Sequence, residues 1–175
     1  MNEIRFENRF VRDESTAKEI YGYWFFKKPL SVAIYIVLGF YSLSCIFGLT
    51  LDFQSAKETI PILAMIVFYV IIMIVSYRSQ VKGMAQRDRE MSGGGELCCE
   101  ISVSDDEITL STLESRNPVA MSNVKSAFMT KNYVVVLTKA RLMFILKKDS
   151  FTKGDADSFI AFLTEKGIKI SGKKN

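Results

Sequence analysis

Two long stretches of the chain contain no charged residue, and they set its organisation. The first runs from Leu30 to Leu51 and the second from Ile60 to Tyr77. As α-helices, at 1.5 Å per residue, they would extend for roughly 33 Å and roughly 27 Å, and the hydrocarbon core of a bilayer is about 30 Å thick. The pattern predicts two transmembrane helices, 30–51 and 60–77, within a membrane hairpin at 29–78.

The connection and the flanks of these stretches predict the orientation. Only residues 52–59 join the two helices, so they form an antiparallel hairpin and both chain ends lie on one side of the membrane. The connection has one basic residue, Lys57, whereas the flanks have several. Basic residues stay inside, so we predict a multi-pass plasma-membrane protein with both termini in the cytoplasm. The basic flanking residues are Lys18, Lys27, Lys28, Arg78, Lys82, Arg87 and Arg89.

Other interpretations of the apolar stretches fit less well. A cleaved signal peptide has a shorter apolar region followed by small residues, and two buried helices of a soluble protein would need more chain to cover them. A pore or pump places ionisable residues inside the membrane, and these spans have none. Ser44 and Gly48 are spaced for close approach of another helix, which suits either packing within the hairpin or a dimer.

The region before the membrane, residues 1–28, is predicted to form a strand and an interfacial helix. The strand covers 4–11, with Asn8 interrupting its alternation, and Asp13 or Ser15 can cap the helix that follows. Aromatic residues next to lysines at the edge of a span are typical of a membrane-interface anchor. The predicted anchor residues are Trp24, Lys27 and Lys28.

The region after the membrane is predicted to contain a polar helix, a linker and a small β-rich domain. Residues 79–96 continue the helix and end in a glycine linker, Gly93 to Gly95. The period then changes to two, and about six strands are expected between 97 and 147, with a hairpin turn at Lys139-Ala140.

One amphipathic helix closes this domain. It starts with a capping box formed by Thr152 and Asp155, buries Ala156, Phe159, Ile160 and Leu163 at helical spacing, and stops at Gly167.

The fold class is therefore an α+β membrane protein. It combines the transmembrane hairpin with a cytoplasmic β-sheet or partly closed barrel at 97–170, which the C-terminal helix caps in a pleckstrin-homology-like manner, and residues 171–175 form a tail. We expect residues 97–170 to fold without the hairpin, because their apolar positions alternate as a self-contained sheet and helix. Whether residues 4–11 join this sheet is left open by the sequence.

The composition offers little for catalysis or metal binding. The chain has no histidine, which is the commonest general base and metal ligand. Cys45 lies in an apolar stretch, and the adjacent Cys98 and Cys99 lack the spacing of a zinc motif. The acidic run 105–107 suits a solvated turn better than an active site. We therefore predict no enzymatic activity, no cofactor and no metal, and the net charge of +4 is too dispersed for nucleic-acid binding.

The layout resembles the YcxB-like family of two-span bacterial membrane proteins. The segment RLMFILKKDSFTKGDADSFIAFL is similar to the family's apolar strand, Pro-Lys-basic step, Phe and acidic helix start; Lys147 and Phe151 match, whereas Leu146 replaces the Pro. In VAMSNVKSAF, Ser122 and Val124 match the family's Trp-Ser-Asp-Ile element. There Met121 and Asn123 replace the Trp and the Asp. The resemblance implies the architecture and a bacterial inner membrane, and it implies no activity.

These features predict a membrane-anchored interaction module that binds a protein, a peptide or a lipid headgroup. Basic side chains that we expect to share one end of a hairpin are the candidate contacts for lipid or partner: Lys139, Arg141, Lys147 and Lys148. Membrane lipid is the expected partner, together with a second copy of the chain or another membrane protein. An accessory subunit of a transporter or enzyme complex is the alternative.

Overall fold

The computed structural model describes residues 3–51, 56–94, 97–112 and 115–172. The chain divides into two compact units, one formed by residues 1–16 and 85–175 and the other by residues 17–84. The α+β class and the two long apolar helices expected from the sequence are confirmed. Of the predicted connection at 52–59, residues 52–55 lie outside the described residues, and residues 56–59 belong to the second long helix instead.

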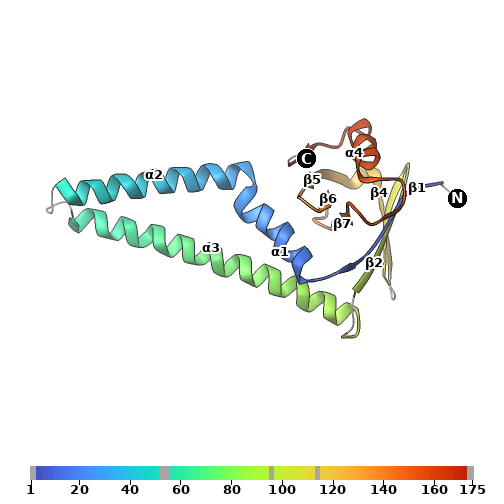
Figure 1. Ribbon diagram of the computed structural model, residues 1–175, viewed down its shortest axis with the longest axis horizontal. Helices are drawn as coiled ribbons and strands as arrows, with labels where there is room; N and C mark the ends of the chain where they lie inside the picture. The colour runs from blue at the N-terminus through green and yellow to red at the C-terminus, as the bar shows by residue number, and fades with distance from the viewer. Residues whose placement is uncertain (1–2, 52–55, 95–96, 113–114, 173–175) are drawn as a thin grey trace. The chain divides into compact units, whose positions relative to one another are not determined.

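In the unit formed by residues 17–84, two helices are long and apolar enough to cross a membrane, within the described part of the chain. The first is α2 (Pro29–Leu51) and the second is the greater part of α3 (Ala56–Met91), which contains Pro61 near its start. Their apolar windows have mean hydropathies of 2.1 and 2.6, and no part of either window is buried. In Figure 1 they run in opposite directions. A long apolar helix whose surface is uncovered is suited to a lipid environment.

The segment before α2 is helical, with a change of helix type. Helix α1 (Glu14–Gly22) is capped by the preceding residue, Asp13, whose carboxylate accepts a hydrogen bond from the amide of Thr16 at 2.8 Å. A π-helical turn, η1 (Tyr23–Lys27), follows. Lys28 then adopts an extended conformation, as expected for a residue before a proline.

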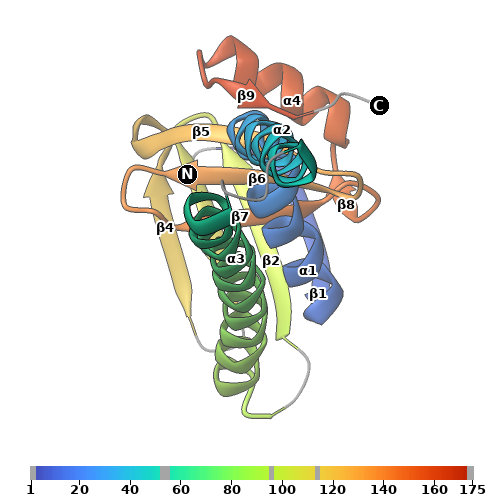
Figure 2. The same ribbon diagram turned by 90° about the vertical axis from the view of Figure 1, so that its left-hand side faces the viewer.

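The other unit contains two sheets, and its described strands form no closed barrel. The first sheet has the order β4-β3-β2-β1-β8 and the second the order β7-β6-β5-β9. In Figure 2, β5, β6 and β7 lie side by side and run across the direction of β2 and β4. The strands are β1 (Ile4–Arg12), β2 (Leu97–Ser104), β3 (Glu107–Ser111), β4 (Arg116–Ala120), β5 (Val124–Met129), β6 (Tyr133–Thr138), β7 (Met143–Lys147), β8 (Phe151–Lys153) and β9 (Ile170–Ser171).

The N-terminal strand belongs to the first sheet, which answers the question that the sequence left open. β1 lies between β2 and β8, and its pairing with β2 runs from Ile4↔Ser104 to Arg12↔Leu97. The sheet of this unit therefore includes a strand outside the interval 97–170. Phe6 of β1 packs in the core, with its ring 5.3 Å from that of Phe159 and 5.5 Å from that of Phe162.

The segment between β3 and β6 forms two strands with a helical turn between them. β4 ends at Ala120, a single 3-10 turn, η3 (Met121–Asn123), follows, and β5 begins at Val124. The side chain of Met121 is 7% exposed and joins the core. The short strands β8 and β9 have too few residues to show a period of two, which explains why the sequence pattern did not predict them.

The C-terminal helix, α4 (Ala156–Glu165), buries Phe159, Phe162 and Leu163. Asp155 caps it by accepting a hydrogen bond from the amide of Ser158 at 2.9 Å, whereas Thr152 lies in β8, so the predicted capping box is wrong. Gly167, with φ of +74°, ends the helix. Its amide donates to the Thr164 carbonyl and that of Ile168 to the Leu163 carbonyl, the pair of bonds that defines a Schellman cap.

Candidate functional site

The membrane-edge residues predicted from the sequence lie together in the unit formed by residues 17–84. Trp24 and Lys27 belong to η1, and the Lys28 ammonium lies 4.5 Å from the centre of the Trp24 ring, a cation–π contact. The Trp24 side chain is exposed. Exposed aromatic and basic side chains beside a long apolar helix are suited to the headgroup region.

Two tyrosines hold this aromatic turn in place. The Tyr35 hydroxyl of α2 donates to the Phe25 carbonyl at 3.2 Å, and the Tyr77 hydroxyl of α3 donates to the Lys18 carbonyl at 3.4 Å. The Phe26 ring stacks on Tyr35 and meets Tyr77 edge-on, with centroids 6.2 Å and 5.3 Å apart. The sequence pointed to Trp24 and the lysines but not to these tyrosines, because their contacts depend on how the helices meet.

The four basic residues expected to share one hairpin end do not do so. Lys139 and Arg141 lie in the turn between β6 and β7, and Arg141 has φ of 64° there, as in a three-residue hairpin loop. Lys147 pairs with Tyr133 at the opposite end of the same two strands, and Lys148 follows it. The expectation was wrong because the five-residue strand β7 separates Lys139 and Arg141 from Lys147 and Lys148 along the sheet.

A different polar cluster connects the ends of β1 and α3. The Arg12 guanidinium donates to both carboxylate oxygens of Asp88, from Nε at 2.9 Å and from Nη2 at 2.6 Å. The two side chains are only 12% and 10% exposed. A bidentate pair with so little exposure has a fixed geometry. Its partners are 76 positions apart, so no sequence pattern could have identified it.

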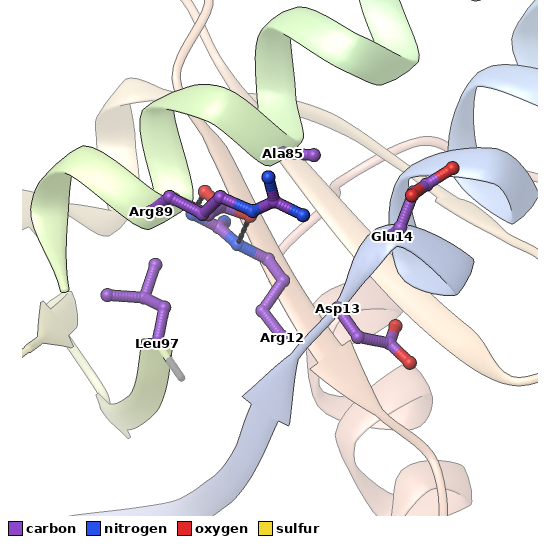
Figure 3. A pocket seen from close by; sticks show the side chains of 7 residues that line it. Arg12, Asp13, Glu14, Ala85, Arg89 and Leu97 are labelled. Atoms are coloured by element: carbon purple, nitrogen blue, oxygen red, sulfur yellow. Dashed lines mark hydrogen bonds and ion pairs between the residues drawn. The ribbon is translucent and has the colours of Figure 1, made fainter. Parts of the chain in front are cut away.

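This ion pair lines a small pocket of about 200 Å³. Figure 3 shows Arg12 and Arg89 at one side of it and the carboxylates of Asp13 and Glu14 at the other. The remaining lining residues are Ala85, Asp88 and Leu97. The Asp13 carboxylate is engaged in capping α1, and both Asp88 oxygens accept from Arg12, so the arrangement is suited to holding the chain together at this point.

The neighbouring cysteine is unsuited to nucleophilic chemistry. Cys99 is 1% exposed, and burial raises the pKa of its thiol, an effect that the charge of Arg12 partly opposes. A buried thiol with a raised pKa carries little thiolate at neutral pH. Among the described residues, no three His, Cys, Asp or Glu side chains are grouped as metal ligands would be.

No protein-family model and no curated protein matches this chain. The residues themselves therefore carry the functional argument. They define an exposed aromatic and basic turn beside two apolar helices, and a folded unit in which the Arg12–Asp88 pair joins the end of β1 to the end of α3.

Proposed function

We propose that this chain is a membrane-anchored interaction module, in which a folded cytoplasmic domain is held at the bilayer by a transmembrane helical hairpin. The two exposed apolar helices, α2 and α3, would cross the membrane. Trp24, Lys27 and Lys28 would lie among the headgroups, with the Trp24–Lys28 contact at the membrane edge. The folded domain would bind protein, peptide or lipid at the cytoplasmic face.

The observation that carries this proposal is the pairing of β1 with β2. The chain leaves the sheet after Arg12 and returns at Leu97, and these two residues are paired neighbours. Both must therefore be in the same compartment, and the segment between them must cross the membrane an even number of times. This argument for a hairpin is independent of the length of the connection at 52–59. The excess of basic residues on the flanks favours the cytoplasm as that compartment.

We further propose that the domain has a pleckstrin-homology-like arrangement with the membrane hairpin inserted in its first β-hairpin. The support is two packed sheets with one C-terminal helix on the core that they share. Membership of the YcxB-like family is part of the same proposal. The segment that carries that resemblance forms β7, β8 and α4.

Membrane extraction and cysteine accessibility test the topology. In a variant whose three native cysteines are replaced by alanine, one cysteine is introduced either at position 55 or at position 173, both outside the described residues. We expect the protein to resist alkaline extraction from membranes. An impermeant maleimide should label position 55 in intact cells, and position 173 only after permeabilisation.

The other outcomes would each contradict a stated part of the proposal. Release of the protein at alkaline pH would contradict membrane insertion. The reverse labelling pattern would contradict the orientation, and labelling of both positions in intact cells would contradict the two-span hairpin. A stoichiometric transporter or enzyme that co-purifies from the native membrane would favour the accessory-subunit alternative.

A further inference from the structure

Basic residues gather at both ends of the sheet β7-β6-β5-β9. The Lys131 end consists of Lys131 in the β5–β6 turn together with Lys147 and Lys148, and the Arg141 end consists of Lys125, Lys139 and Arg141. From Tyr133 to Thr138 the strand between them advances roughly 17 Å at about 3.4 Å per residue. That distance is about twice the Debye length of roughly 8 Å at physiological salt. The two ends are therefore separate charged surfaces.

The Lys131 end is held in a defined shape. The Lys148 ammonium donates to the Thr130 carbonyl at 2.7 Å and to the Lys131 carbonyl at 3.1 Å, and the Lys148 amide donates to the Asn132 carbonyl at 2.9 Å. Lys148 thus fixes the turn that carries the exposed side chain of Lys131.

Asp149 is the carboxylate that pairs with these lysines in the described part of the chain. The Lys147 ammonium lies 3.7 Å from Asp149, but the two side chains are 37% and 74% exposed. Ion pairs with that exposure are weak. Three lysines and one aspartate leave the Lys131 end positive.

The distinguishing feature of the Lys131 end is its connection to the segment that leads to the first apolar helix. The hydroxyl of Tyr133, the residue paired with Lys147, lies 3.0 Å from Thr16 Oγ1 in a buried hydrogen bond. Thr16 is the last residue of the N-terminal segment, 1–16, that belongs to this folded unit. Residues 17–28 alone separate it from α2, a length of about 18 Å as a helix. The Arg141 end lies roughly 17 Å from the Lys131 end, measured along the strands.

From this geometry we propose that the Lys131 end docks on anionic lipid headgroups at the membrane surface, and that the Arg141 end does not. The inference rests on the proposed membrane anchoring. A basic residue gains electrostatic energy near an anionic surface, and the gain fades within a Debye length. Although the two ends have similar charge, only the one tied to Thr16 is kept close to the bilayer by the short connection.

Hydrogen–deuterium exchange of the full-length protein in lipid nanodiscs tests this. Discs of phosphatidylcholine alone are compared with discs that also contain phosphatidylglycerol, at low and at high salt. We expect residues 130–133 and 147–149 to exchange more slowly in the anionic discs, and high salt to remove this difference. In the Lys131→Gln/Lys147→Gln variant, the ratio of the exchange rates in neutral and anionic discs should fall by up to roughly 30-fold. That is the change expected when two lysines no longer face an anionic surface.

The matched control is Lys139→Gln/Arg141→Gln, which removes the same charge from the Arg141 end and should retain the protection. Lys148 stays unchanged in both variants because its ammonium holds the turn. Equal exchange in the two kinds of disc, or loss of protection only in the control variant, would overturn the inference. Either result in a protein that remains inserted in the disc would leave the proposed anchoring intact, whereas failure to insert would refute both.

Discussion

Asn8 of β1 and Lys147 of β7 exchange two hydrogen bonds and thereby join the two sheets. The side-chain Nδ2 of Asn8 donates to the main-chain carbonyl of Lys147 at 2.7 Å, and the side-chain Oδ1 of Asn8 accepts from the main-chain amide of Lys147 at 3.1 Å. Asn8 is fully buried. One side chain thus satisfies both main-chain groups of an edge-strand residue, as a neighbouring strand would. This explains why a polar residue interrupts the alternation of β1.

Replacement of Asn8 by alanine should destabilise the folded domain by about 1–3 kcal/mol. The Lys147 amide loses its bond to Asn8, and the Lys147 carbonyl keeps only the bond that the Ser150 amide donates. Thermal unfolding of the detergent-solubilised protein, followed by circular dichroism, measures this. The matched control is Asn117→Ala on the exposed edge strand β4, which should be nearly neutral. Equal effects of the two substitutions would contradict the role assigned to Asn8.

The Arg12–Asp88 pair should be a strong contact that depends on both partners. Removal of one charge, by Asp88→Asn or Arg12→Gln, should cost about 3 kcal/mol, because the other charge stays largely buried without its partner. The double variant should cost less than the sum of the two single changes.

A double-mutant cycle by thermal unfolding measures this coupling. The exposed Arg5–Asp105 pair, with side chains 50% and 45% exposed, is the comparison and should give a coupling below about 1 kcal/mol. Additive effects at Arg12 and Asp88 would show that the pair contributes no specific coupling.

The pairing of β1 with β2 predicts how the cytoplasmic domain can be isolated. Residues 97–170 alone lack β1, so β2 and β8 lose their shared neighbour and the core loses Phe6. A chain in which Asn-Gly replaces residues 13–96 closes the β1–β2 hairpin directly, because Arg12 and Leu97 are paired and Asn-Gly favours a two-residue hairpin turn.

We expect this closed chain to be soluble and to unfold cooperatively, and the 97–170 fragment to lack a cooperative transition. Calorimetry and near-ultraviolet circular dichroism of the two purified proteins decide between these outcomes. Cooperative unfolding of the fragment alone would show that β1 is dispensable, as the alternation of residues 97–170 by itself suggests.

The sequence by itself determined the features that depend on neighbouring residues. Uncharged runs long enough to span a bilayer predicted α2 and α3, and Gly167 marked the end of α4 because a helix ends readily where a residue adopts positive φ. The period of two predicted β2 and β3 because alternate side chains of a strand face opposite sides.

Tertiary structure alone decided which distant residues meet. The position of β1 between β2 and β8, the partner of Asn8, and the Arg12–Asp88 pair all join residues far apart in the chain. The placement of Lys147 away from Arg141 also needed the strand register, since both residues are close in sequence but lie at opposite ends of β7. Local patterns fix how each segment folds, whereas the pairing of strands depends on which arrangement buries the whole set of apolar faces together.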